Sequence, residues 1–256
     1  MRGRRSGDGE HFVSSYDWAN CTRTLLSDLL VEALVVLPVG ATEQHGPHLP
    51  TGTDALIVGA IAGEAVQRAG ESSPRPLVLT PALPFGASDH HFPFGGTLSL
   101  RNETVTSVLL DLLRSVHEAG GSRALLVNGH GGNRGPCHSA AHAASTRHGM
   151  HVGYLDYWSL LAGDPDAARI PGHAGAFETA MVSHLQPTKL GPVPPPAQRP
   201  HRPGADGVVL HSEALWRAID GYSDQPADAR AEDGARWFES CVQALASRIT
   251  ELAGSL

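Results

Sequence analysis

Glu43, His45 and Asp54 form the first group of side chains in this sequence that could bind a metal ion. Histidine nitrogens and carboxylate oxygens are the ligands that divalent transition metals take in proteins. In extended backbone, side chains alternate with a period of two, so Glu43 and His45 point to the same face. The side chain of Asp54, at the start of a predicted helix, could point to the same face and bridge two ions. The alternative is that Glu43 caps an element and that His45 is a polar loop residue.

His130 lies in a second segment, whose sequence is NGHGGN. Glycines on both sides allow the backbone to turn sharply and to approach a bound group, which favours a functional role for this histidine. A phosphate-binding loop is the alternative interpretation. However, the segment matches neither G-x-G-x-x-G nor G-x-x-x-x-G-K-[ST], and Lys189 is the only lysine in the chain. We therefore do not expect a nucleotide site.

Two more segments carry candidate catalytic and substrate-binding residues. His173 precedes Glu178 in a glycine-containing loop that leads into a predicted helix. Glu178 could instead be an acidic first-turn residue that stabilises the helix dipole. Ser88 and His91 belong to a loop of small residues and histidines, and they either line a pocket or lie at the surface.

The elements that must position these residues alternate along the chain. Apolar runs predict buried strands at residues 33–39, 76–80, 124–127 and 152–155. Helical spacing and composition predict helices at residues 54–69, 102–119, 135–148, 176–185 and 228–252. This alternation predicts a three-layer α/β/α sandwich with a mostly parallel sheet. Active sites of such sheets lie beyond the carboxyl ends of the strands, where the polar segments above begin.

The chain has 256 residues and a net charge of −7, which fits one large domain and does not indicate nucleic-acid binding. No apolar stretch is long enough to span a membrane, and no hydrophobic signal segment follows the basic N-terminus. The 3 cysteines form no C-x-x-C pair, so we expect a reducing, cytoplasmic location. We expect residues 1–15 to be a disordered tail and residues 16–256 to be one domain. Within that domain, residues 187–203 form a proline-rich linker or arm.

Four segments resemble the motif blocks of the creatininase (creatinine amidohydrolase) family, in the same order along the chain. They are PVGATEQHGPHLPTGTD, GASDHHFPFGGTLS, VNGHGGN and HAGAFETA. The form G-H-G-G-N is similar to that of branches that include formamide deformylases, an inosose-type ring hydrolase and the peptidase that trims the mycofactocin precursor. The C-terminal segment GYSDQPADARAEDGARWF also looks somewhat like the tail of that last branch.

The resemblance implies a binuclear metal centre in a hexameric enzyme. Its ligands would be Glu43, His45, His130 and a bridging Asp54, holding two divalent ions of Zn, Mn or Fe. His173 would act at the substrate as a proton shuttle or polarising group. Creatininase has a glutamate ligand and a substrate-stacking aromatic where this chain has Gly132 and Gly131. Glu178 is therefore the candidate for the missing ligand, and creatinine is disfavoured as the substrate.

The expected reaction is hydrolysis of an amide or lactam C–N bond in a small molecule or short peptide by a metal-activated water. Glu178 would be either a ligand or the base that takes the proton of that water. One alternative is a ring-opening or C–C hydrolase that uses the same metal site. Another is a non-catalytic metal-binding relative, which the complete ligand set argues against. We expect a homo-oligomer, with no nucleic-acid or membrane partner.

Overall fold

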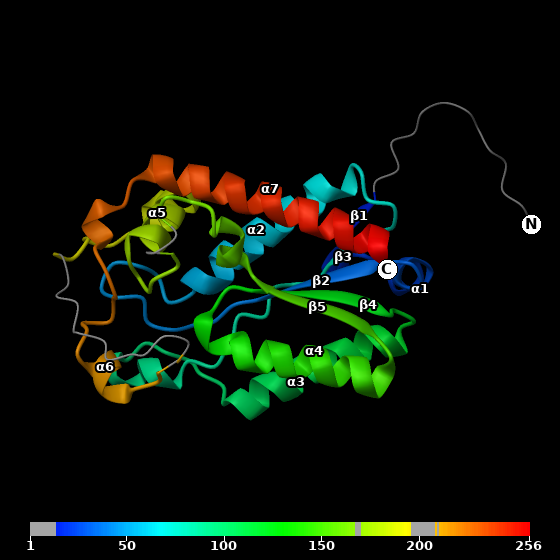
Figure 1. Ribbon diagram of the computed structural model, residues 1–256, viewed down its shortest axis with the longest axis horizontal. Helices are drawn as coiled ribbons and strands as arrows, with labels where there is room; N and C mark the ends of the chain where they lie inside the picture. Colours follow the sequence, from blue (N-terminus) through cyan, green and yellow to red (C-terminus); the bar gives the residue numbers. More distant parts are fainter. Residues whose placement is uncertain (1–13, 167–169, 196–207, 209) are drawn as a thin grey trace, which may run out of the picture.

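Five parallel strands run through the centre of the computed structural model, which describes residues 14–166, 170–195, 208 and 210–256 (Figure 1). The strands are β1 (Ser15–Asp17), β2 (Leu34–Val39), β3 (Leu77–Leu79), β4 (Arg123–Asn128) and β5 (His151–Asp156). Their order in the sheet is β1-β3-β2-β4-β5. β2 is central, and in its pairing with β4 Val36 lies opposite Leu125 and Val39 opposite Asn128. The chain leaves β2 toward β3 and then crosses to β4, so a topological switch point lies beside β2.

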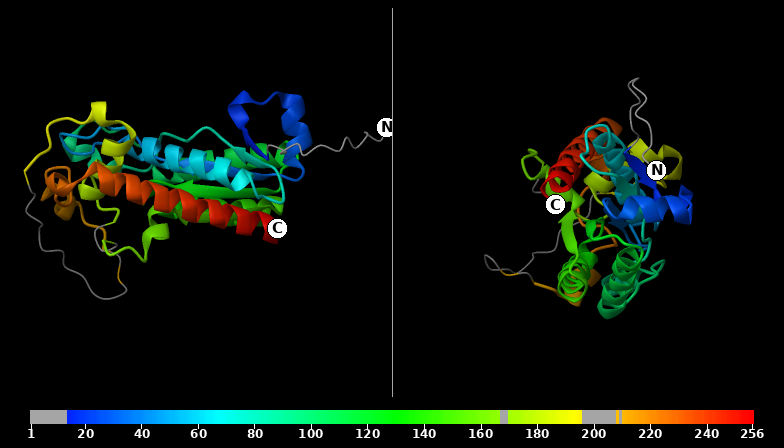
Figure 2. Two further views of the ribbon diagram at one scale, coloured as in Figure 1. Left: turned by 90° about the horizontal axis from the view of Figure 1, so that it is seen from above. Right: turned by 90° about the vertical axis from the view of Figure 1, so that its right-hand side faces the viewer.

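Helices cover both faces of the sheet. One face packs against α2 (Thr53–Gly70), α5 (Ala176–Leu185) and α7 (Ala231–Ser255), and the other against α3 (Asn102–Glu118) and α4 (Arg134–His148). α2 and α7 lie side by side along the molecule (Figure 2).

Strands β2, β3, β4 and β5 supply both cores, because their side chains alternate between the two faces. In β2, Leu34 and Val36 belong to the α2 side, whereas Val35 and Leu37 belong to the α3 side. The predicted three-layer α/β/α single domain is confirmed.

Several short elements were not predicted from the sequence. They are β1, α1 (Arg23–Leu30) and α6 (Glu213–Arg217), together with the 3-10 turns η1 (Trp18–Asn20), η2 (Asp89–Phe94), η3 (Gly131–Asn133), η4 (Tyr157–Leu161), η6 (Pro187–Lys189) and η7 (Pro226–Asp228). β1 has only 3 residues and pairs with β3 at the sheet edge, so its local sequence pattern is too short to identify it. β1 also includes Ser15, the last residue of the predicted tail, whereas residues 1–13 lie outside the described residues. No helix in the described ranges is long and apolar enough to cross a membrane.

The C-terminal helix begins later than predicted, at Ala231 instead of residue 228. Residues 226–228 form the turn η7, and Arg230 is extended with φ −126° and ψ 139°. The predicted proline-rich arm is described only up to residue 195. Within that part, the Gly191 N–H donates to the His48 carbonyl over 2.7 Å, and the Tyr222 hydroxyl donates to the Pro195 carbonyl over 2.9 Å. The described start of the arm therefore lies on the loop that follows β2.

Candidate metal centre

The loops that follow β2 and β4 meet at the carboxyl edge of the sheet. The Gly129 N–H donates to the Val39 carbonyl over 2.8 Å, which continues the pairing of the two strands. A Cβ at Gly129 would lie 2.6 Å from the Cβ of Val58 in α2, so only glycine allows this close approach. As a consequence, His130 lies beside Asp54 in the first turn of the same helix.

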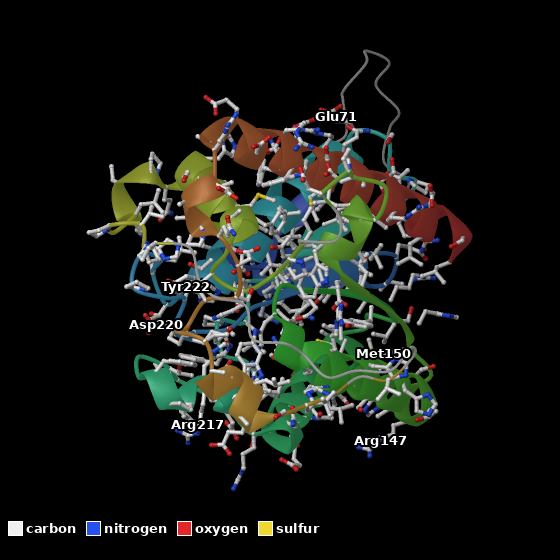
Figure 3. All side chains as sticks on the ribbon, turned by 60° about the vertical axis from the view of Figure 1, so that its left-hand side comes forward. Glu71, Arg147, Met150, Arg217, Asp220 and Tyr222 are labelled. Atoms are coloured by element: carbon white, nitrogen blue, oxygen red, sulfur yellow. The ribbon has the colours of Figure 1, made fainter. Side chains whose placement is uncertain are left out.

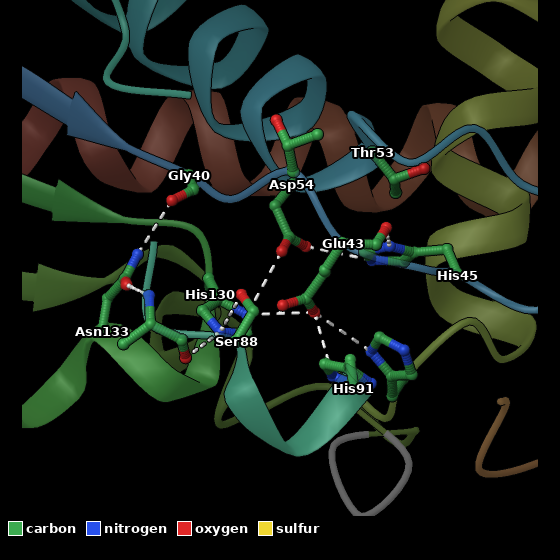
Figure 4. A network of polar contacts seen from close by, with 12 residues as sticks. Gly40, Glu43, His45, Thr53, Asp54, Ser88, His91, His130 and Asn133 are labelled. Atoms are coloured by element: carbon green, nitrogen blue, oxygen red, sulfur yellow. Dashed lines mark hydrogen bonds and ion pairs between the residues drawn. The ribbon is translucent and has the colours of Figure 1, made fainter. Parts of the chain in front are cut away.

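Asn133 connects the loops that follow β2, β3 and β4. Its Oδ1 accepts from the Ala87 N–H over 2.9 Å, and its Nδ2 donates to the Gly40 carbonyl over 2.9 Å (Figure 4). A Cβ at Gly86 would lie 2.6 Å from the Asn133 Oδ1. These buried bonds fix the backbone around the predicted ligands.

Asp54 faces two groups of potential ligands, one through each carboxylate oxygen. Its Oδ2 lies 3.2 Å from the Nδ1 of His130, which is also 3.2 Å from the Oε1 of Glu43. Its Oδ1 lies 3.2 Å from the Nε2 of His45, which is 3.7 Å from the Oε2 of Glu178. Figure 4 shows Asp54 between the two histidines. The structure thus brings all five predicted ligands together, with Asp54 shared between the two groups.

Backbone carbonyls set the tautomers of both histidines. The Nε2 of His130 lies 3.0 Å from the Ala87 carbonyl, and the Nδ1 of His45 lies 3.0 Å from the carbonyl of Glu43. A carbonyl only accepts, so these nitrogens carry the protons in the neutral rings. In the neutral rings, the other nitrogens, which face the carboxylates, have free lone pairs. Ligating histidines are held in this way in metal sites.

The burial of the carboxylates provides a test of whether a cation fits. Glu43 is 0% exposed and Asp54 is 3% exposed. Both oxygens of Glu43 and the Oδ2 of Asp54 accept no hydrogen bond of good geometry from the described residues. Buried carboxylates without partners are costly unless they are paired with cations or bind metals. The donor set therefore fits divalent metal ions.

The same side chains perturb one another's protonation in the absence of a metal. Burial would lower the pKa of His45, but Asp54, Glu178 and Glu43 raise it to about 10. Burial raises the pKa of Glu178 to about 8, with a further contribution from Asp54, although His45 acts in the opposite direction. Two cations on the shared carboxylates would remove the need for these protons.

His173 and Glu178 reach the site from the loop before α5 and from its first turn. The Nε2 of His173 lies 3.0 Å from both the backbone carbonyl and the side-chain Nε2 of Gln44. Its Nδ1 therefore points toward the ligands, 3.7 Å from the Oε1 of Glu43. The Oε2 of Glu178 accepts from the Ala174 N–H over 2.5 Å and faces His45.

Ser88 and His91 also lie in the site, and both are buried. The Ser88 hydroxyl is 3.4 Å from the Nε2 of His130. The Nε2 of His91 is 3.2 Å from the Oε1 of Glu43. The loop that follows β3 thus contacts the ligands themselves.

Sequence reasoning missed residues that hold this site from distant segments. The Ser223 hydroxyl accepts from the His173 N–H over 2.7 Å, and the Oδ1 of Asp224 accepts from the Ala176 N–H over 2.9 Å. The Trp216 ring of α6 lies 4.8 Å from the ring of His91 and 5.8 Å from that of His173. Figure 3 shows α6, which carries the labelled Arg217, next to η2. The only sequence signal was the motif-like segment around Ser223.

Comparison with known proteins gives consistent matches over most of the chain. The family model named Creatininase, described as creatinine amidohydrolase, matches residues 19–249. The mycofactocin precursor peptide peptidase of Mycolicibacterium smegmatis is 35% identical, with 84% of each chain covered. The creatinine amidohydrolase of Pseudomonas putida is 26% identical, covering 86% of this chain and 90% of that protein. A solved structure titled "Creatininase Mn" superposes with a TM-score of 0.75 at 27% identity, covering 92% of this chain and 97% of that one.

Proposed function

Because this chain belongs to the creatininase family of amidohydrolases, we propose that it is a metal-dependent enzyme that hydrolyses an amide C–N bond in a small molecule or short peptide. The observation that carries the proposal is the position of Asp54, whose two oxygens face two separate histidines. A carboxylate in this position suits two ions that share one ligand.

Each ion would be held by three side chains of this chain. Glu43, Asp54 and His130 would hold one, and His45, Asp54 and Glu178 the other. Histidine and carboxylate ligands suit Zn, Mn and Fe. When bound, such ions activate water as a nucleophile near neutral pH and polarise the substrate carbonyl.

His173 would supply the proton that the leaving nitrogen needs. Its Nδ1 faces the ligands, and burial, together with the neighbouring His45 and His91, holds its pKa well below the ordinary value. The ring is therefore neutral near pH 7. With its Nε2–H donated to the Gln44 carbonyl, it could take a proton at Nδ1 and pass it on. The position of Glu178 next to His45 supports a role as ligand over a role as free base. Ser88, in the loop that follows β3, would position the substrate carbonyl.

The surroundings of positions 131 and 132 favour a substrate other than creatinine. No atom lies within 4 Å of a Cβ built at Gly131, so this side of His130 is open. A Cβ at Gly132 would lie 2.0 Å from the Ala87 carbonyl, so no side chain can reach the metals from there. The relatives named as mycofactocin precursor peptide peptidases support a short peptide.

The first experiment is to count metals in the full chain by elemental analysis after reconstitution with Zn, Mn or Fe. We expect about two ions per chain in the wild type. His130→Ala should lose bound metal and activity together, because it removes one of three ligands at its ion. His138→Ala is the matched control, since His138 is an exposed residue of α4. Full metal content and full activity in His130→Ala would sink the assignment.

The second experiment tests the reaction. The metal-loaded protein is incubated with short peptides, formamides, lactams and creatinine, and the products are identified by mass spectrometry. We expect addition of one water across a C–N bond, with the rate lost on chelation and restored by metal. A protein that binds two ions yet cleaves only C–C bonds would overturn the amide assignment.

A further inference from the structure

The side-chain amide of Gln44 has a fixed orientation. Its Oε1 accepts from the Gly46 N–H over 2.9 Å, and a backbone N–H can only donate. A Cβ at Gly221 would lie 2.4 Å from the same Oε1, so the amide is tightly enclosed on that side. The NH2 group therefore points to the other side, toward the Nδ1 of His91.

This orientation determines which nitrogen of His91 carries the proton. The Nε2 of Gln44 lies 2.8 Å from the Nδ1 of His91, and an amide NH2 only donates. The Nδ1 of His91 must then accept, which leaves the proton of the neutral ring on Nε2. That Nε2 lies 3.2 Å from the Oε1 of Glu43, an ion-pair distance. Both atoms are buried, and neither forms a hydrogen bond of good geometry with the described residues.

His91 thus differs from His45 and His130 in whether the ring nitrogen that faces the carboxylates carries a proton. Those two rings donate to backbone carbonyls and turn a free lone pair toward the site. His91 accepts from an amide and turns an N–H toward the site. His91 lies with Glu43 and His173 in a group whose atoms are close enough to hold a metal ion, but the contact with Gln44 places the proton of its neutral ring on the nitrogen that faces Glu43.

We infer that His91 is a positioning residue, whose Nε2–H faces the ligand Glu43 and whose tautomer is set by Gln44. The inference rests on the proposed function, because Glu43 matters here as a metal ligand. A carboxylate oxygen can accept one hydrogen bond and still bind a cation with its second lone pair. Residues that orient metal ligands in this way typically contribute a 10–100-fold gain in metal affinity. This role differs from the substrate contact that the sequence predicted for His91.

The test compares zinc affinity and zinc count in the full-length wild type, His91→Ala and His91→Gln. His91→Ala should bind as many zinc ions at saturation as the wild type, with an affinity about 10–100-fold lower. His91→Gln keeps an N–H near the Nε2 position and should recover most of that loss. If His91→Ala loses one zinc at saturation, His91 is a ligand and the inference is wrong. An unchanged affinity in His91→Ala also overturns it.

Nitrogen-15 spectra of the histidine rings give a readout that a purely structural role would not affect. In the zinc-loaded wild type, His91 should show the proton on Nε2. Gln44→Glu places an acceptor at Nδ1, so the proton should move there and zinc affinity should fall. The loss should not add to that of His91→Ala, because both changes break the same contact with Glu43. A proton on Nδ1 in the wild type would refute the inference while leaving the zinc count, and so the proposed function, intact.

Discussion

Gly132 shows how one residue restricts the ligand set. The Ala87 carbonyl accepts the bond that orients His130, and a Cβ at position 132 would lie 2.0 Å from that oxygen and 2.5 Å from the His130 Nε2. A side chain there would push apart the atoms that hold the histidine. In the proposed metal centre, the third carboxylate therefore comes from α5, as Glu178.

We expect Gly132→Ala to lower the free energy of unfolding by about 2 kcal/mol, because backbone atoms must shift to admit the methyl group. Zinc affinity should fall with it, since His130 loses its orientation. Gly131→Ala is the matched control: no atom lies within 4 Å of its Cβ, and its stability should stay within about 0.5 kcal/mol. Chemical denaturation with zinc titration measures both. Equal stabilities of the two variants would contradict the close packing at position 132.

The packing of α7 on α5 positions the helix that carries Glu178. A Cβ at Gly234 of α7 would lie 2.0 Å from the Ala180 carbonyl of α5, so the two backbones are in direct contact. Trp237 and Cys241 continue the buried stripe of α7 in the core cluster that also contains Phe177 of α5. This contact fixes the distance between α7 and α5, whose first turn carries Glu178.

We expect Gly234→Ala to destabilise the protein by about 2 kcal/mol and to weaken zinc binding, because α5 must move away. Gly63→Ala in α2 is the control for helix propensity. Its Cβ would meet only the Leu79 Cδ2 at 3.9 Å, and the change should stabilise by about 0.5–1 kcal/mol. Thermal and chemical unfolding measure both effects. A stabilising Gly234→Ala would show that the two helices can separate at no cost.

The candidate metal centre buries three acidic side chains and two histidines inside the molecule, namely Glu43, Asp54, Glu178, His45 and His130. Their charges balance only when cations or protons are bound. In the metal-free state, the pKa of His45 is raised to about 10 by its acidic neighbours despite burial, and that of Glu178 is raised to about 8 by burial. The ordinary values are 6.5 and 4.5. The folded protein therefore holds protons that the unfolded chain has released above neutral pH.

We expect the metal-free protein to lose stability as pH rises from about 7 to 9. Both pKa values are raised in the folded state, so the folded state binds more protons and stability falls with pH. Zinc affinity should rise over the same range, because zinc replaces those protons. Melting temperatures of chelated and zinc-loaded samples at each pH measure both trends. A metal-free melting temperature that rises between these pH values would contradict the proposed balance of buried charge.

The sequence by itself determined the layers of the fold and the identity of the ligand candidates. The apolar runs of β2 and β4 and the stripes of α2 and α3 are local, since burial of one face imposes a period that can be seen along the chain. Polar residues that directly follow parallel strands must meet at one edge of the sheet. Glu43 and His130 could therefore be placed together without coordinates.

Only the tertiary structure decided what each side chain does at that edge. The donor or acceptor role of His91 depends on Gln44, whose amide is oriented by the Gly46 N–H and enclosed by Gly221. The loop that carries His173 is held by Ser223, from a segment far along the chain. These contacts join residues with no common period or motif. Their geometry exists only after the chain has packed, because hydrogen-bond direction is not encoded in residue spacing.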